Sequence, residues 1–144
     1  DMNPGALALA KTYGADEVLP SEGAGAAVSE LTAGQGADAV IEIVGAPETL
    51  SWSLPATKSG GKLILVGYAP GRPYGIDTMM MHYREYTVMG SRFTTKAELL
   101  ELIQLVEQGK IRPVVTKTLP FDQANEALEA LKKKTHLGRI VLML

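Results

Sequence analysis

Residues 36–45 read GADAVIEIVG, and this stretch decides the fold class. Successive residues of a strand point to opposite faces of a sheet, so a run of apolar residues makes a strand apolar on both faces. The apolar residues here are Val40, Ile41, Ile43 and Val44. Such a pattern is typical of a parallel strand that helices cover on both sides. We therefore expect a buried strand over residues 38–44.

Helical and extended patterns alternate on either side of this strand, which favours a parallel sheet with right-handed crossovers. Further strands are expected at 17–20 (EVLP), 60–67 (GGKLILVG) and 84–91 (REYTVMGS), with a loop at 68–75. Helices are expected from the N-cap Asn3 to Gly14, over 22–32, between Pro47 and Pro55, and from Thr95 to Gly109. The last of these has the strongest helix pattern, because Thr95 and Glu98 have the spacing of a capping box.

The pattern changes after Gly109 to one strand, one helix and one strand. The strands are expected at 113–119 and 138–144, and Asp122 is expected to cap the helix between them. The sequence thus predicts an α/β fold with a parallel sheet and flanking helices, followed by a C-terminal strand-helix-strand tail that packs elsewhere.

The composition is that of a soluble globular protein, with 46% hydrophobic and 21% charged residues in 144. The net charge is -2 and the only lysine run, LKKKTH at 131–136, reads as a solvated helix end, so nucleic acid is not expected as a partner. The chain has no cysteine, which excludes disulfides and thiolate-bound zinc supplied by its own residues. No apolar run is long enough to span a membrane and no signal peptide is recognisable, so we expect a cytoplasmic protein.

A glycine follows each of the three strongest strands. Ligands of open parallel sheets bind beyond the carboxyl ends of the strands, so these positions are candidates for a binding site. A single glycine there usually only makes a turn, whereas three in register also suit a flat ligand lying across the strand ends. Both interpretations stay open. The candidate residues are Val44 and Gly45, then Val66, Gly67 and Tyr68, then Met89, Gly90 and Ser91.

Two charged residues elsewhere are candidates for binding the same ligand. If a strand precedes Asp1, its carboxylate can accept both hydroxyls of an adenosine ribose and repel a 2′-phosphate. Arg139 offers a planar donor fork that suits a pyrophosphate. The alternatives are a solvated chain end for Asp1 and an ordinary surface arginine for Arg139.

No catalytic cluster is recognisable in the sequence. His82 and His136 are far apart and have no metal-ligand spacing, and no serine lies in a G-x-S-x-G motif. GAGAA at 23–27 does not follow a strand as a phosphate-binding loop must. The sequence therefore predicts a binding domain that has no catalytic residue and no metal site of its own.

Five stretches, in this order and spacing, resemble the medium-chain dehydrogenase/reductase superfamily, with the zinc-dependent alcohol dehydrogenases as its nearest branch. Each is weakly specific alone, but together they are highly specific over the whole chain. The resemblance implies a partial dinucleotide-binding (Rossmann) domain over 1–109 and, over 110–144, a C-terminal segment that returns to a catalytic domain. The stretches are DMNPGALALAKTYGADEVL, GADAVIEIVGAPETL, GGKLILVG, REYTVMGS and FDQANEALEALKKKTHLGRIVL.

The resemblance also implies a role for each candidate residue in binding NAD. Asp1 matches the acidic residue that holds the adenosine ribose, and Arg139 matches the arginine that contacts the pyrophosphate. Val44 and Gly45 match residues that line the adenosine side. The residues that match positions near the nicotinamide are Val66, Gly67, Tyr68, Met89, Gly90 and Ser91. Ala6 stands where the family often has a basic residue at the ribose.

The family's zinc ligands, proton relay and glycine-rich phosphate loop would lie upstream of Asp1. We therefore expect this chain to be the cofactor-binding part of a longer enzyme that transfers hydride between an alcohol and NAD, and to be inactive alone. One alternative is a zinc-free quinone or enoyl reductase of the same superfamily that prefers NADPH, which Asp1 argues against. Another is an inactive remnant that self-associates.

The expected partners are a nicotinamide cofactor and, in the longer enzyme, a small alcohol or carbonyl substrate. The resemblance also implies a homo-oligomer formed through sheet edges, because the strand order of the resembled fold would leave 38–44 and 86–90 each at an edge. No membrane partner is expected.

Overall fold

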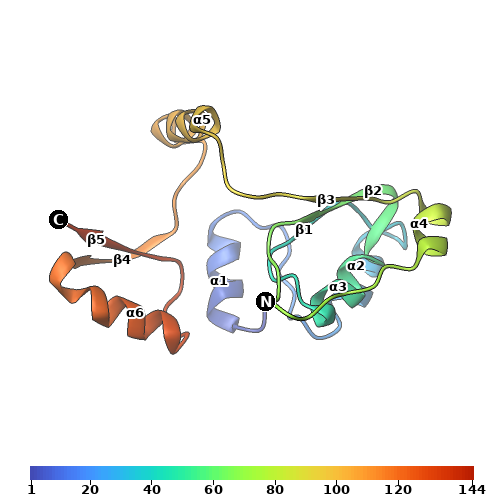
Figure 1. Cartoon of the computed structure of the whole chain (residues 1–144), viewed down its shortest axis with the longest axis horizontal. Coiled ribbons are helices and arrows are strands. Elements are labelled where there is room, and N and C mark those ends of the chain that lie inside the picture. Colours follow the sequence, from blue (N-terminus) through green and yellow to red (C-terminus); the bar gives the residue numbers. More distant parts are fainter. The chain divides into compact units, whose positions relative to one another are not determined.

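The computed structural model describes residues 1–144, which form two compact units (Figure 1). One unit contains Met2 and residues 19–93, and we call it the sheet unit. The other contains Asp1, residues 3–18 and residues 94–144, and we call it the tail unit. The predicted α/β class with parallel sheets and flanking helices is confirmed in both.

A three-stranded parallel sheet forms the centre of the sheet unit. Its order is β1 (Ala37–Glu42), β2 (Thr57–Leu65) and β3 (Thr87–Gly90). The strands expected from residues 38, 60 and 84 onward are thus confirmed, with shifted ends. The register places Ile41 beside Ile64 and Ile64 beside Met89.

Three helices accompany this sheet. They are α2 (Ala24–Leu31), α3 (Pro47–Ser53) and α4 (Thr78–Arg84). Pro47 starts α3 because its fixed φ suits the first turn of a helix, where no hydrogen-bond donor is needed. The sequence analysis missed α4, although Asp77 caps it by accepting a hydrogen bond from the Met79 N–H at 2.8 Å. The buried core of the sheet unit consists of Leu50, Leu54, Leu63 and Tyr86.

Only one face of the three-stranded sheet is covered, so the expected burial of 38–44 on both faces is wrong. Ile41 and Ile43 are 65% and 70% exposed, whereas Leu63 on β2 is fully buried. The reason is that α3 and α4 pack on β1 and β2 from the side that holds the core. The row of Ile41, Ile64 and Met89 belongs to the opposite, uncovered face.

The tail unit contains a second, two-stranded parallel sheet. It pairs β4 (Val115–Pro120) with β5 (Arg139–Met143), and η1 (Phe121–Gln123) and α6 (Ala124–Lys132) connect them. The expected strand-helix-strand tail is thereby confirmed. The unit also holds α1 (Pro4–Thr12) and α5 (Lys96–Glu107).

Contacts between segments far apart in the sequence hold α1 in the tail unit. The Arg112 guanidinium lies 4.1 Å from the centroid of the Tyr13 ring and donates to the Thr12 carbonyl at 3.3 Å. That carbonyl is one of the four at a helix end that lack a partner within the helix. Arg112 therefore supports the C-terminal end of α1.

Two expectations about local structure are wrong. Residues 17–20 form no strand, because a strand needs a hydrogen-bonded neighbour and the sheet ends at β1. Asp122 is not the cap of α6, because it lies inside the 3₁₀ turn that precedes the helix, and the cap position is occupied by Gln123 without a side-chain bond.

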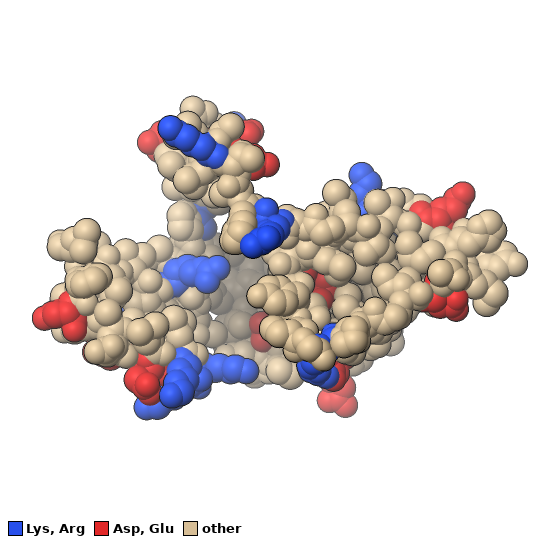
Figure 2. Space-filling view, viewed as in Figure 1, with Lys and Arg blue, Asp and Glu red and all other residues tan.

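Acidic and basic side chains are interspersed on the face drawn in Figure 2, with no broad region of one sign. No helix of the structure is both long and apolar enough to cross a membrane.

Candidate functional site

The carboxyl ends of β1, β2 and β3 lie at the same edge of the sheet because all three strands are parallel. The structure therefore brings together eight of the ten predicted binding residues: Val44, Gly45, Val66, Gly67, Tyr68, Met89, Gly90 and Ser91. We call this edge the strand-end site. Asp1 and Arg139 belong to the tail unit.

The three glycines are not in register, contrary to the expectation. Gly90 lies beside Leu65, which in turn lies beside Glu42. Gly90 is therefore set back from Gly67 and Gly45, which follow Leu65 and Glu42 by two and three residues. The expectation assumed that each strand extends equally far before its glycine, but β3 ends at its glycine while β1 and β2 end earlier.

Gly45 and Gly67 are required by the close approach of two backbone segments. A Cβ atom on Gly67 would lie 2.0 Å from the Ile43 carbonyl oxygen, and one on Gly45 would lie 2.4 Å from the Gly67 carbonyl oxygen. Gly45 also has a φ of +68°, which favours glycine. These two glycines thus have a structural role between the exits of β1 and β2.

Gly90 differs from the other two glycines because no atom lies within 4 Å of the position that its Cβ would take. A side chain there would enter open space, so the fold itself does not require a glycine. Gly90 therefore leaves room for a ligand to approach the backbone at the end of β3.

A buried carboxylate, which the sequence analysis did not single out, closes the exit of β1. Glu42 is 6% exposed, and its side chain accepts hydrogen bonds from the Val44 N–H at 3.0 Å and the Gly45 N–H at 2.5 Å. Its backbone carbonyl accepts from the N–H groups of Val66, at 2.8 Å, and Gly67, at 3.2 Å. Glu42 thus fixes the chain as it leaves two strands. Its signal in the sequence is an acidic residue inside an otherwise apolar strand.

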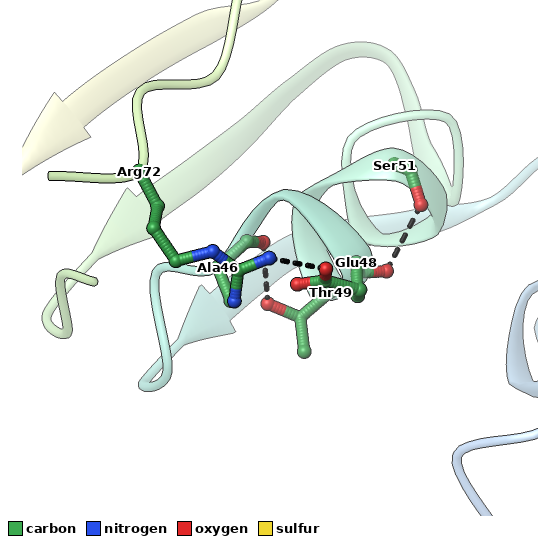
Figure 3. A network of polar contacts seen from close by, with 5 residues as sticks. All are labelled: Ala46, Glu48, Thr49, Ser51 and Arg72. Carbon is green, nitrogen blue, oxygen red and sulfur yellow. Dashed lines mark hydrogen bonds and ion pairs between the residues drawn. The ribbon is translucent and has the colours of Figure 1, made fainter.

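An ion pair attaches the loop after β2 to the start of α3 (Figure 3). The Arg72 guanidinium bonds the Glu48 carboxylate, and this bond holds the pKa of Glu48 below its ordinary value. The Ala69 N–H donates to the Gly45 carbonyl at 3.2 Å in the same region. Because Glu48 lies in the first turn of α3, the loop is held next to the exit of β1.

A pocket of about 750 Å³ opens at the ends of β2 and β3. This volume lies in the range of small-molecule sites, roughly 300–1,000 Å³. Most of the lining is apolar or uncharged, and Tyr68, which is 80% exposed, forms part of it. The full lining is Leu65, Val66, Gly67, Tyr68, Gly90, Ser91, Arg92 and Phe93.

Five of the predicted residues line this pocket, while Val44, Gly45 and Met89 do not. Gly45 instead borders a smaller pocket of about 200 Å³ that also reaches Gly67, Tyr68 and core leucines. The sequence analysis missed Arg92 and Phe93, which directly follow Ser91. Extending the third strand end by two residues would have included them.

In the tail unit, Asp1 precedes the N-cap of α1, and Arg139 is the first residue of β5. The Asp1 carboxylate accepts a hydrogen bond at 2.8 Å from the N–H of Asn3, the N-cap of α1. Arg139 is an exposed residue at the start of β5, and its N–H donates to the Val114 carbonyl at 2.7 Å. Their predicted binding roles stay predictions.

No group of three or more histidine, cysteine, aspartate or glutamate side chains is placed to hold a metal ion. His136 instead forms a 3.0 Å hydrogen bond with the Thr116 hydroxyl. The residues of this chain therefore do not fit a zinc ion. By contrast, the strand-end site fits a flat cofactor, because it combines the pocket with the open space at Gly90.

Residues 13–142 match a family model described as zinc-binding dehydrogenase. Two curated relatives are NAD-dependent alcohol dehydrogenases, from Sulfolobus acidocaldarius (34% identical over 99% of this chain) and Sulfurisphaera tokodaii (33% identical over 99%). The crystal structure of an alcohol dehydrogenase from Aeropyrum pernix is similar over 100% of the chain, with a TM-score of 0.88 and 34% identity. The chain spans 41–42% of the length of these three proteins.

Proposed function

This chain belongs to the zinc-binding dehydrogenase family, and we propose that it is the NAD-binding part of an alcohol dehydrogenase that transfers hydride between a small alcohol or carbonyl compound and NAD. The observation that carries the proposal is the pocket at the parallel strand ends, which lies where open α/β sheets bind their ligands. The likeness to NAD-dependent relatives over almost the whole chain supports the choice of cofactor.

Each candidate residue then has a role in holding the cofactor. Val66, Gly67, Tyr68, Met89 and Ser91 would lie near the nicotinamide. Gly90 allows the ring to approach the backbone. These residues would keep the ring fixed and exclude water from it, which would favour reaction by orientation. NAD supplies the chemistry when bound, since its nicotinamide accepts the hydride.

Asp1 and Arg139 would hold the other half of the cofactor. The carboxylate of Asp1 would accept the hydroxyls of the adenosine ribose and repel a 2′-phosphate, which would make NAD the preferred cofactor. The guanidinium of Arg139 donates to the pyrophosphate. Val44 and Gly45 line the adenosine side.

The zinc ligands and the phosphate loop would come from a part of the longer protein outside these residues. The division at residue 109 into a cofactor domain and a returning segment, 110–144, is part of the same proposal. We also infer a cytoplasmic location, which the lack of cysteine favours.

The proposal is tested on the protein that carries this chain, with zinc, NAD and a series of simple alcohols. We expect reduced nicotinamide to form with NAD in preference to NADP, and residues 1–144 alone to give no turnover under the same conditions. Absence of cofactor binding to the whole protein, measured by fluorescence of the reduced nicotinamide, would contradict the proposal.

A further inference from the structure

The pocket at the ends of β2 and β3 has a single charged residue in its lining, Arg92. No acidic side chain and no lysine line it. The guanidinium therefore sets the sign of the charge that the pocket presents to a ligand.

Arg92 is also held differently from other arginines of the sheet unit. Arg72 is paired with the Glu48 carboxylate, and Arg84 donates to the Tyr86 hydroxyl at 3.0 Å. The Arg92 guanidinium instead lies 4.5 Å from the centroid of the Phe93 ring and has no hydrogen bond or ion pair within the chain. All five of its N–H donors thus lack a protein acceptor.

The backbone at Phe93 turns the chain at the edge of the pocket. Phe93 has a φ of +57°, a left-handed conformation that is unusual for a bulky residue, and its side chain is 87% exposed. Its ring lies beside the Arg92 guanidinium, and both residues line the pocket. The aromatic ring contacts the guanidinium and leaves its N–H donors accessible.

We propose that Arg92 is a specificity-determining residue that selects alcohols carrying a carboxylate, that is, hydroxy acids. The guanidinium fork matches the two oxygens of a carboxylate and forms two parallel hydrogen bonds with it. A phosphate dianion would be expected to recruit further donors, but the lining offers no second cation. The hydroxy acid would lie with its carboxylate at Arg92 and its alcohol carbon toward the nicotinamide.

This inference rests on the proposed function only for the position of the reacting alcohol. Binding of a carboxylate at Arg92 can be measured without any reaction. The two proposals therefore fail separately.

The equilibrium test uses butyrate and butyramide, which have nearly the same shape but differ in charge. The whole protein with bound NAD is titrated with each, and the arginine side-chain N–H signals are followed by nuclear magnetic resonance. We expect butyrate to shift the Arg92 signal and butyramide not to shift it. A butyrate titration that leaves the Arg92 signal unchanged would overturn the assignment, whether or not the protein oxidises alcohols.

The kinetic test compares hydroxy acids of increasing length with their amides in the wild type and in Arg92→Leu. Loss of a charge-assisted pair should lower kcat/KM for the best hydroxy acid by roughly 10- to 100-fold, mainly through KM. The matching amide should change little, and Arg92→Lys should restore part of the loss.

Arg72→Leu is the matched control, because it removes an exposed arginine of the same unit that does not line the pocket. It should affect acid and amide equally. Equal losses for acid and amide in Arg92→Leu would show a general disturbance of the site and would overturn the inference.

Discussion

Gly67 allows the backbone segments that leave β1 and β2 to approach each other closely, so its missing side chain is a packing requirement. A Cβ atom there would lie 2.0 Å from the backbone oxygen of Ile43, which cannot move away like a flexible side chain. We predict that Gly67→Ala lowers the free energy of unfolding by about 3 kcal/mol or more through overpacking.

Denaturant unfolding of the wild type, Gly67→Ala and Gly75→Ala measures this effect. Gly75 is the control, because no atom lies within 4 Å of its Cβ position. If both variants unfold like the wild type, the two strand ends do not approach each other as described.

Asp1 is predicted to set the preference for NAD over NADP in the protein that carries this chain. Replacing Asp1 by serine should narrow the preference by roughly 1–3 kcal/mol, because it removes a charge-assisted hydrogen bond to the ribose. The measurement is kcat/KM with each cofactor, and Asp16→Ser is the control, an exposed acid of the same unit. An unchanged ratio for Asp1→Ser would remove Asp1 from the ribose site.

At the scale of elements, the capping box of α5 makes that helix sensitive to acid. The Glu98 carboxylate accepts hydrogen bonds from the Thr95 N–H at 2.7 Å and the Thr95 hydroxyl at 2.8 Å, and the Glu98 N–H donates back to that hydroxyl at 3.2 Å. The bond from the Thr95 backbone is the main reason why the pKa of Glu98 lies below its ordinary value.

The direction of the pH effect follows from this lowered pKa. The folded helix favours the ionised Glu98 carboxylate. The contribution of this carboxylate to the stability of α5 is therefore fully present above the ordinary glutamate pKa of about 4.3, and it is lost as the pH falls through the lower pKa that Glu98 has in the folded state. We predict that the protection factors of the amide hydrogens in the first turn of α5 fall in that acidic range.

Glu98→Gln should abolish this acid response, because its amide keeps an acceptor oxygen but does not titrate there. Glu101→Gln, in the same helix, should retain it. An acid response that persists in Glu98→Gln would assign the effect to another group.

The elements show which structural features can be predicted from the sequence. Local signals sufficed for α5, with its capping box, and for β1 and β2, with their apolar runs. They failed for residues 17–20, because a strand exists only where a neighbour pairs with it. They also could not reveal that the second face of β1 is uncovered, since burial depends on which elements pack there.

The candidate site could likewise be predicted from the sequence only where it depends on local signals. The strand ends could be found because parallel strands bring their carboxyl ends to one edge. The setback of Gly90 relative to Gly67 depends on strand register, which local patterns do not determine. The pairing of Arg72 with Glu48, 24 residues apart, likewise depends on the folded chain.

At the scale of the whole molecule, neither edge of the three-stranded sheet is paired with another strand of the chain. We therefore predict that the chain of residues 1–144 is not a monomer in solution. The preferred interface is the edge at residues 86–90, and the second choice is pairing at 38–44. Light scattering at micromolar concentration tests the prediction, and a mass near 15.3 kDa would contradict it.

Val88→Pro distinguishes the two edges. The Ser91 N–H donates to the Leu65 carbonyl, and N–H directions alternate along a strand, so the Val88 N–H points to the free edge. Proline at this position should therefore prevent pairing through β3 while retaining the bonds to β2. A dimer that survives in Val88→Pro would exclude the preferred interface.

The central claim is that a nicotinamide cofactor lies against the strand ends, and Gly90→Ala tests it most directly. The added Cβ enters open space in the chain itself, so thermal unfolding should be unchanged. It would collide with a bound cofactor, so the Kd for reduced nicotinamide cofactor in the whole protein should rise roughly tenfold, as expected for overpacking of 1–3 kcal/mol. Gly75→Ala should change neither quantity. A Kd that stays at the wild-type value in Gly90→Ala would contradict the account.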